Sequence, residues 1–390
     1  MDVSLFIARR LRFKGRIAVV SIAISFFVMI LSVSISSGFR NEIRDGISYL
    51  SGDVQITPVN LNYLDESTPI ERYPSYLEEV KSLSGVSGIS PAVYRAGIIK
   101  NETNIQGVIF KGIESFVGDS IPQLSVSVPS SLASLLNLSE GDEIQSYFVG
   151  EKVKVRKFRI YSIYEGIIGS DDNLIVYASL SDIQRINGWT SDQVSVLEVS
   201  LDRKLRNVSG MKEMTAEIGS TAMFFSSDDE TSVVATSAVS RYPQIFDWLD
   251  LIDFNVLFIL ILMTVVAGFN MISGLLIMLF ENISTIGLLK SLGMQDRGVA
   301  IIFLASSSAL VLKGMLYGNA LALAFCFLQG QFHLIELDPS NYFISFMPVH
   351  IDLQLILAAD VMAYMVIMLL LLLPSLFITK VDPSRTVRMS

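Results

Sequence analysis

Few side chains in this 390-residue sequence are suited to covalent or acid–base chemistry. The chain has one cysteine, Cys326, and two histidines, His333 and His350, all near its C-terminal end. Because residues 40–250 contain neither type, Ser-His-Asp and Cys-His catalytic arrangements are unavailable there. One cysteine also excludes an intramolecular disulfide and a cysteine-cluster metal site. Acidic residues are plentiful in this stretch, but no spacing singles out the paired carboxylates of a glycosidase, so we expect it to bind or transmit rather than to catalyse.

The chain also lacks the motifs of a nucleotide-hydrolysing protein. No GxxxxGK[ST] phosphate-binding loop occurs, and the dipeptide Gly-Lys is absent altogether. If ATP drives this protein, a partner subunit must bind and hydrolyse it, and we expect no cofactor in this chain. The formal net charge is −9, and the acidic excess lies in residues 40–250, which argues against nucleic acid as a partner.

The elements that would position any functional residue include four long apolar segments. Hydrophobic residues make up 51% of the chain, charged residues make up 17%, and the mean hydropathy is +0.52. The apolar segments, each long enough to cross a bilayer, are Ile17–Ser36, Phe254–Phe280, Val299–Leu328 and Leu353–Phe377. The first is longer than the apolar core of a signal peptide, so we expect four transmembrane helices.

Lysine and arginine near the ends of these segments predict the orientation. Basic residues precede the first segment, follow the fourth and lie between the second and third, whereas residues 329–352 contain none. The basic residues concerned are Arg9, Arg10, Arg12, Lys14, Arg16, Lys290, Arg297, Lys380, Arg385 and Arg388. Both termini are therefore expected in the cytoplasm, and residues 39–250 on the other side of the membrane.

Residues 39–250 predict an α+β domain. Alternating, β-branched stretches predict strands within residues 51–59, 96–113, 142–149, 153–166, 173–180 and 193–201. Helices are expected within residues 75–83, 130–138, 180–188 and 204–219, and residues 232–253 are expected to be helical up to the second membrane segment.

The most informative stretch follows the second apolar segment. Ile283, Ile286, Leu289 and Leu292 recur every three residues beside Leu288, which predicts a short helix over residues 282–293 with one apolar stripe. Lys290 near its end suits the helix dipole, and Gly293 suits its termination. A helix this short is marginal alone. Its stripe needs either a groove in a partner protein or the membrane interface.

This stretch resembles a known family. The pattern E-x-x-x-x-IG-x-LK-x-LG, carried by Glu281, Ile286, Gly287, Leu289, Lys290, Leu292 and Gly293, is similar to the coupling helix of type VII ABC transporter permeases, the FtsX/MacB superfamily. Further stretches look most like the LolC/LolE lipoprotein-releasing permeases. They are residues 5–14, 38–57, 105–114, 155–167, 313–319, 337–349 and 373–388. One departure is Asn282, where the family usually has a basic residue.

The resemblance implies a domain organisation. Residues 1–38 would hold an N-terminal cytoplasmic helix and the first transmembrane helix, and residues 39–250 a periplasmic MacB-like domain. Residues 251–390 would form an FtsX-like permease domain with transmembrane helices two to four. The fold class is thus a helical membrane domain of four transmembrane helices with a large extracytoplasmic α+β domain inserted between the first and second.

The resemblance also implies partners in the inner membrane. Two permease subunits, identical or related, would pair, and cytoplasmic ABC ATPase subunits would grip their coupling helices. An acylated lipoprotein would be drawn from membrane lipid and passed to a periplasmic LolA-like chaperone. In LolC a protruding hook captures that chaperone, but here only a tight hairpin is expected, at Val149, Gly150, Glu151 and Lys152. The alternative within the family is a permease that regulates a cell-wall enzyme or exports a peptide.

The third apolar segment contains a charged residue, Lys313, which is expected near mid-bilayer, where a charge costs at least about 2.5–3.5 kcal/mol. Two interpretations stay open: a charge that faces a cavity or a second subunit, or one that snorkels to the interface or bonds the backbone. Asp360 lies at a different depth, so no direct pair is expected. Gly314 and Gly318 resemble a small-residue helix contact. Asp253 and Asp360 could suggest an intramembrane enzyme, but no Gly-x-Gly-Asp pattern accompanies them.

Overall fold

The computed structural model describes residues 16–62, 68–101, 104–116, 120–150, 152–164, 174–338, 342 and 344–375. The chain divides into two compact units. One comprises Met1–Asn41, Trp248–Glu336 and Phe346–Ser390, and the other comprises Glu42–Asp247 and Leu337–Ser345. The basic N-terminal residues before Arg16 and the basic tail from Lys380 lie outside the described residues.

Long helices dominate the first unit. They are α2 (Arg16–Ser51), α8 (Pro243–Glu281), α10 (Asp296–Phe332) and α12 (Leu353–Ser375), with the short α9 (Ile283–Ser291) between α8 and α10. The four long helices are each long and apolar enough to cross a membrane, which confirms the four predicted apolar helices. Their outward side chains are also apolar, with Phe258 61% and Leu369 66% exposed, as expected of helices surrounded by lipid.

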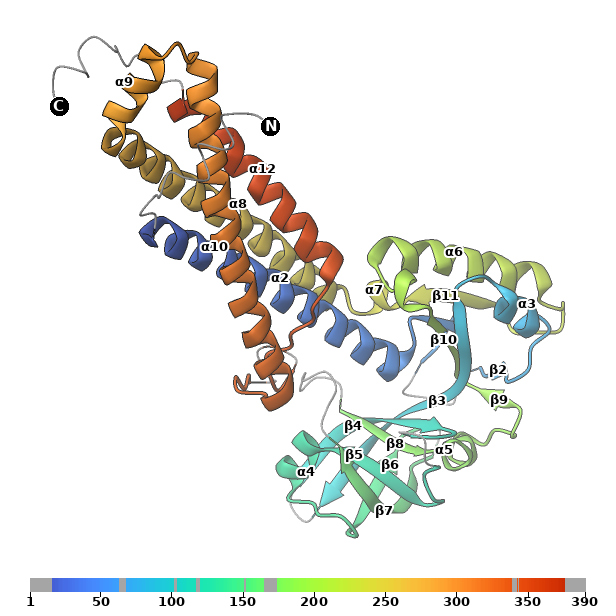
Figure 1. Ribbon diagram of the computed structural model, residues 1–390. Coiled ribbons are helices and arrows are strands. Elements are labelled where there is room, and N and C mark those ends of the chain that lie inside the picture. The colour runs from blue at the N-terminus through green and yellow to red at the C-terminus, as the bar shows by residue number, and fades with distance from the viewer. Residues whose placement is uncertain are drawn as a thin grey trace. The chain divides into compact units, whose positions relative to one another are not determined.

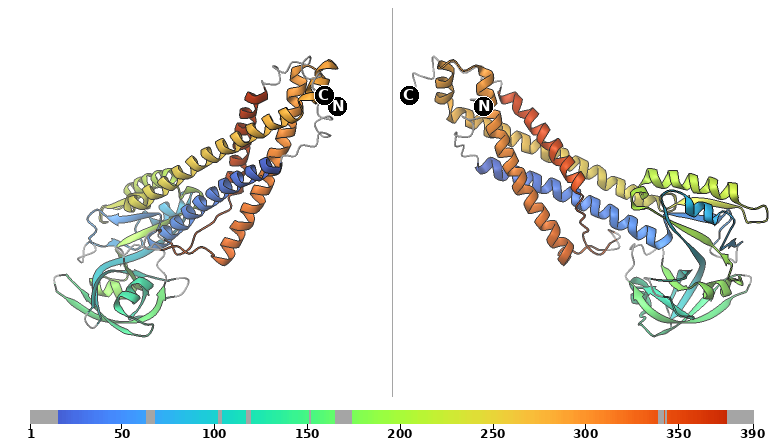
Figure 2. Two further views of the ribbon diagram at one scale, coloured as in Figure 1. Left: turned by 90° about the vertical axis from the view of Figure 1, so that its left-hand side faces the viewer. Right: turned by 45° about the vertical axis from the view of Figure 1, so that its right-hand side comes forward.

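A large buried cluster helps to join these helices into the bundle that Figure 2 shows. It includes Phe26 of α2, Met271 of α8, Phe303 of α10 and Ile367 of α12. The close approach of α2 and α10 depends on two glycines. A Cβ at Gly318 would lie 2.5 Å from the carbonyl oxygen of Ala23, and one at Gly314 would lie 2.6 Å from Cγ2 of Ile22. The expected small-residue contact is thus present and faces α2.

The second unit is built on a mixed sheet (Figure 1). Its strands are β1 (Val54–Pro58), β2 (Ile70–Glu71), β3 (Val86–Asn101), β4 (Asn104–Ile113), β5 (Ser125–Pro129), β6 (Glu143–Phe148), β7 (Lys154–Tyr164), β8 (Ile175–Ser179), β9 (Gln193–Val194), β10 (Val196–Leu201) and β11 (Val233–Ser237). Its helices are α3 (Leu77–Ser82), α4 (Ser130–Leu136), α5 (Leu180–Asn187), η1 (Arg203–Leu205), α6 (Val208–Phe225) and α7 (Ala238–Arg241). Nine of the described strands follow the order β11-β1-β10-β3-β4-β8-β5-β7-β6.

The long strand β3 belongs to two parts of this sheet. Its first half pairs with β10, and its second half pairs with both β4 and β6. Because β6 returns to β3, the strands β3, β4, β8, β5, β7 and β6 close into a small barrel. Phe110, Phe148 and Phe158 pack their rings together within it.

The structure differs from the sequence expectation at several strands. The short strand β2 and residues 86–95 of β3 were not predicted as strands. Residues 232–253 were expected to be helical throughout, but residues 233–237 form β11, which pairs with β1 from Val54↔Ser237 to Pro58↔Val233. The β-branched residues of VVATS favour a strand, but the helix-compatible residues that follow it led to the prediction of a helix. The short strand β5 was not predicted, because SVSVP has only five residues and runs directly into α4.

Candidate functional site

The helix α9 forms the expected short element after the second apolar helix, at the end of the bundle where α2 begins (Figures 1 and 2). The bend between α8 and α9 lies at Asn282. Its backbone N–H still donates to Met278 O at 3.2 Å, as does its side-chain amide at 2.9 Å, while its own carbonyl accepts from the N–H of Ile286 at 3.0 Å. Asn282 therefore makes hydrogen bonds to both α8 and α9, and the chain changes direction at this residue, whose φ is −110°.

The apolar side chains of α9 are divided between two faces, which differs from the single stripe expected from the sequence. Ile286 is 1% exposed and joins the buried cluster of the bundle. Gly287 is also buried, and Leu289 is half-buried. On the opposite face Leu288 is 57% and Leu292 76% exposed. The three-residue repeat obscured this division, because it placed Ile286 and Leu292 on one stripe.

The remaining predicted residues lie at the ends of this segment. Glu281 ends α8 and is exposed, and Ile283, the first residue of α9, is 37% exposed. Lys290 pairs with Asp296 at 2.8 Å, so the turn into α10 is closed by an ion pair. Gly293 has φ +91°, a conformation that favours glycine after a helix. The segment thus presents Leu288 and Leu292 outward from a short helix that is fixed at both ends.

The tight hairpin expected near Val149 is present between β6 and β7. The strands remain paired as far as Phe148↔Lys154, so no long hook extends from them. Val149 is 53% exposed, its carbonyl accepts a hydrogen bond from Arg95 at 2.8 Å, and Gly150 and Lys152 follow it on the surface. Glu151 lies outside the described residues.

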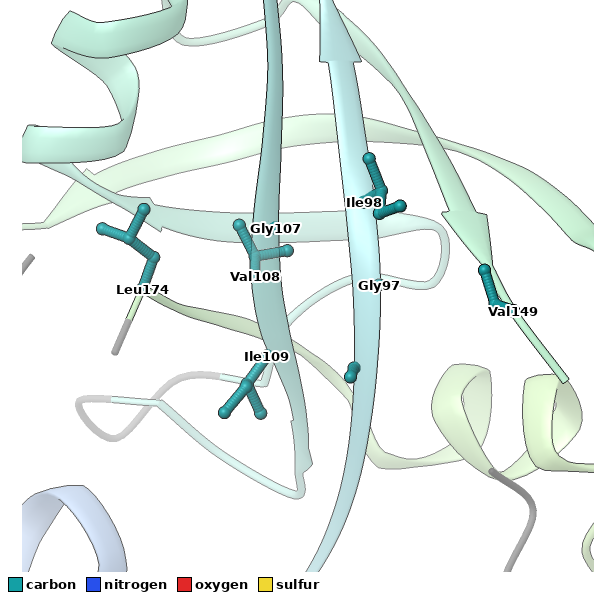
Figure 3. A pocket seen from close by; sticks show the side chains of 8 residues that line it. Gly97, Ile98, Gly107, Val108, Ile109, Val149 and Leu174 are labelled. Atoms are coloured by element: carbon teal, nitrogen blue, oxygen red, sulfur yellow. The ribbon is translucent and has the colours of Figure 1, made fainter. Parts of the chain in front are cut away.

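An apolar pocket of about 340 Å³ lies beside this hairpin. Figure 3 shows Ile98 on β3, Val108 and Ile109 on β4, and Leu174 before β8 around it. A Cβ at Gly107 would meet no atom within 4 Å, so this part of β4 is open. No side chain that lines it can act as an acid, base or nucleophile, so the pocket offers contact area and no chemistry.

A buried polar network, which sequence reasoning missed, holds the C-terminal end of α2 in the second unit. The Lys111 ammonium lies 2.8 Å from Glu198 and donates to the carbonyl of Leu50 at 2.7 Å. Tyr94 donates to the same carboxylate at 2.6 Å, and Gln55 donates to it at 3.2 Å. Burial lowers the pKa of Lys111 although Glu198 opposes the shift, and burial and the Glu198 charge together raise the pKa of Tyr94. The sequence held one signal for this network: a single charged residue lies in each of two otherwise apolar strands, Lys111 in GVIFKGI and Glu198 in VLEVSL.

Further cations bind the same end of α2. Arg241 donates to the carbonyls of Ser51 at 3.0 Å and Gly52 at 2.7 Å. Cations at the C-terminal end of a helix interact favourably with its dipole. Six residues before Ser51, Asp45 pairs with Arg203 at 2.5 Å and with Arg206 at 2.8 Å. The end of α2 is therefore fixed to strands and loops distant in sequence.

The intramembrane charges lie apart from one another, as expected for Lys313 and Asp360. Asp360 accepts a hydrogen bond from the Asn319 amide at 2.5 Å. Asp253 of α8 accepts one from Ser36 at 2.8 Å and pairs with Arg40, so it joins α8 to α2. Lys313 is exposed on α10. The mid-bilayer position of Lys313 stays a prediction. Within the bundle, its neighbour Gly314 packs against Val19 and Ile22 in the first turns of α2.

The sequence of this chain is similar to those of known proteins. The FtsX-like permease C-terminal family matches residues 257–383. The lipoprotein-releasing system transmembrane protein LolC of Neisseria meningitidis is 21% identical over 373 residues, which cover 87% of this chain and 86% of the relative. LolE of Haemophilus influenzae is 20% identical over 410 residues, covering 95% and 93% of the two chains.

Among solved structures, the periplasmic region of MacB from Actinobacillus actinomycetemcomitans aligns with 49% of this chain and 91% of its own, at 14% identity and a TM-score of 0.31. The family match thus covers residues 257–383, and the chain is similar over most of its length to LolC and LolE.

Proposed function

We propose that this chain is the permease subunit of an ABC transporter that releases acylated lipoproteins from the inner membrane. The chain crosses the membrane four times, with both termini and α9 in the cytoplasm and the strand-rich unit in the periplasm. A separate subunit binds and hydrolyses ATP, and a second permease subunit, identical or related, completes the transporter. The similarity to LolC and LolE over most of the chain supports the choice of substrate.

The observation that carries the proposal is the outward face of α9. Leu288 and Leu292 are one helical turn apart and exposed, while Ile286 fixes the opposite face to the bundle. Neighbouring residues four apart on a helix form one surface ridge. Such a ridge on a firmly seated helix fits an apolar groove in an ATPase, and force applied to it is passed directly to α8 and α10.

Extraction of a lipoprotein from the membrane requires energy from a partner such as an ATPase. Each buried methylene of an acyl chain is worth about 0.8 kcal/mol in the bilayer, so removing a lipid anchor needs external free energy. In the proposed mechanism, closure of the ATPase pair displaces α9. The helices α2 and α8 then carry this movement towards the periplasmic unit, where the buried network around Lys111 and Glu198 holds the end of α2.

The test replaces the outward leucines of α9. Leu288→Glu and Leu292→Glu each add a charge that an apolar groove cannot accept cheaply, so an ATPase with a phosphate-binding loop should no longer co-purify with the full-length chain. Gln295→Glu is the matched control, because Gln295 is exposed just before α10 and gains the same charge at a helix N-terminus. Retention of the ATPase by both leucine variants would contradict the assignment of α9.

The substrate is tested separately. Depletion of the chain should leave acylated lipoproteins in the inner membrane, as measured by fractionation of inner and outer membranes. Normal sorting of lipoproteins together with an intact ATPase complex would instead favour the regulation of a cell-wall enzyme or the export of a peptide.

A further inference from the structure

A groove on the membrane unit lies between α2 and α10. It has a volume of about 680 Å³, and the residues around it include Arg16, Val20, Ile24, Lys313, Tyr317 and Leu321. The groove follows from the glycine contact described above. Gly314 and Gly318 bring the two backbones together, so the larger side chains on either side diverge and leave a furrow.

The walls of this groove are apolar and open to the surroundings. Val20 and Ile24 of α2 are each 58% exposed, and Leu321 of α10 is 61% exposed. These three side chains extend from the charged end of the groove towards the middle of both helices. Within a bilayer such a surface lies against acyl chains.

Both charged residues that line the groove are cations. They are Arg16, the first residue of α2, and Lys313. Within the described ranges neither makes an ion pair. An uncompensated lysine at the centre of a membrane helix costs about 2.5–3.5 kcal/mol, which snorkelling to the interface reduces.

The packing places these two cations at similar depth. Gly314, the neighbour of Lys313, lies against Val19 and Ile22, and at 1.5 Å per residue these positions are only about 5–9 Å along α2 from Arg16. The Lys313 side chain can therefore extend to the polar layer in which Arg16 lies. Tyr317 follows one turn later and is 58% exposed, and tyrosine favours the membrane–water interface.

We propose that this groove binds an anionic phospholipid, whose headgroup phosphate lies between Arg16 and Lys313 and whose acyl chains follow Val20, Ile24 and Leu321. The charge pattern supports this occupant, because two cations at one end of an apolar furrow match a molecule with an anionic head and two apolar tails. With α2 beginning at the cytoplasmic face, the lipid belongs to the inner leaflet. The groove is thus separate from any path by which a substrate leaves the outer leaflet.

The experiment measures the lipid that co-purifies with the full-length chain. The protein is extracted in mild detergent, incubated with equal amounts of phosphatidylglycerol and phosphatidylcholine, and analysed by native mass spectrometry. Wild type should retain phosphatidylglycerol preferentially. Arg16→Gln/Lys313→Gln should bind it about thirtyfold more weakly, since each of the two cations near an anionic lipid contributes about 1 kcal/mol. Arg297→Gln, which removes an exposed cation outside the groove, should bind it as wild type does.

Three results would overturn the proposal. The first is equal retention of phosphatidylglycerol by the double variant in a chain whose thermal unfolding matches that of wild type. The second is the absence of a headgroup preference in wild type. The third is a disulfide between two copies of the chain when Ile24→Cys and Leu321→Cys are introduced into separate copies, which would assign the groove to a second permease subunit. None of these readouts depends on ATP hydrolysis or lipoprotein release, so the proposed function can fail independently.

Discussion

The ammonium of Lys111 lies between two oxygen atoms of different elements: the Glu198 carboxylate on β10 at 2.8 Å and the Leu50 carbonyl at the end of α2 at 2.7 Å. A side chain from β4 therefore joins a helix end to β10, which lies on the far side of β3 in the sheet. Lys111 is 2% and Glu198 7% exposed, so water does not compete for either charge. Because Lys111 binds both groups, the position of the C-terminal end of α2 depends on the pairing of strands that lie far along the chain.

Removal of Lys111 should be costly because it leaves Glu198 buried without its cation. We expect Lys111→Met to lower the free energy of unfolding by about 3–5 kcal/mol. The matched variant Lys111→Met/Glu198→Gln removes both charges and should lose much less. Thermal unfolding of the full-length chain in detergent measures both, and equal losses in the two variants would show that the ion pair has no role of its own.

The two arginines that bind Asp45 allow a second comparison. Arg206 is 19% exposed and also lies 3.2 Å from Asp53, which is fully buried, whereas Arg203 is 77% exposed. Arg206→Ala should therefore cost several times more stability than Arg203→Ala, for which about 0–1 kcal/mol is expected. Hydrogen exchange of the amides at residues 45–53 is the measurement. Equal protection in the two variants would show that the pair between Arg206 and Asp53 adds no stability.

The close contact of α10 with α2 predicts a difference between two glycines. At Gly318 a new Cβ would meet the Ala23 carbonyl at 2.5 Å and Cβ of Phe26 at 2.8 Å. Neither atom belongs to a flexible side-chain end, so Gly318→Ala should destabilise the bundle by about 1–3 kcal/mol. At Gly274 the nearest atom is Cβ of Ala18 at 3.5 Å. Gly274→Ala should be neutral or stabilising, since alanine favours a helix, and detergent melting temperatures distinguish the two.

Much of the architecture could be predicted because the signals are local. Four long apolar runs specify four helices, and alternation specified most strands of the second unit. The strand β11 was missed because VVATS is short and is followed by a helical sequence, so that only its pairing with β1 identifies it. Long-range pairing of this kind leaves no local periodicity.

The candidate site was predictable as a segment but not as a surface. The repeat in α9 located a short apolar helix, yet which leucines face outward depends on how α8 and α10 pack against it. The exposed face contains Leu288 and Leu292, while Ile286 is buried. The network around Lys111 could not be predicted either, because its members come from α2, β1, β3, β4 and β10, and only the folded sheet brings them together.

The loop around Glu230 predicts a dependence on pH. Glu230 Oε1 accepts hydrogen bonds from the Ser75 amide and hydroxyl, each at 2.7 Å, and Oε2 accepts one from the Ser227 amide at 3.1 Å. Burial alone would raise the pKa of Glu230, but these hydrogen bonds outweigh it and hold the pKa below 4.5. The folded pKa is thus lower than the unfolded one, so the stabilisation is present above about pH 4.5 and is lost as the pH falls through the folded pKa.

Hydrogen exchange of the Ser75 and Ser227 amides, corrected for intrinsic rates, should therefore show protection that declines as the pH is lowered from about 6 to about 3. Glu230→Gln should lack this decline, because a neutral amide does not titrate in this range. The control Asp228→Asn, at an exposed neighbouring carboxylate, should retain it. A decline of the same size in Glu230→Gln would assign the pH dependence to another group and would show that the Glu230 carboxylate does not hold the Ser75 loop.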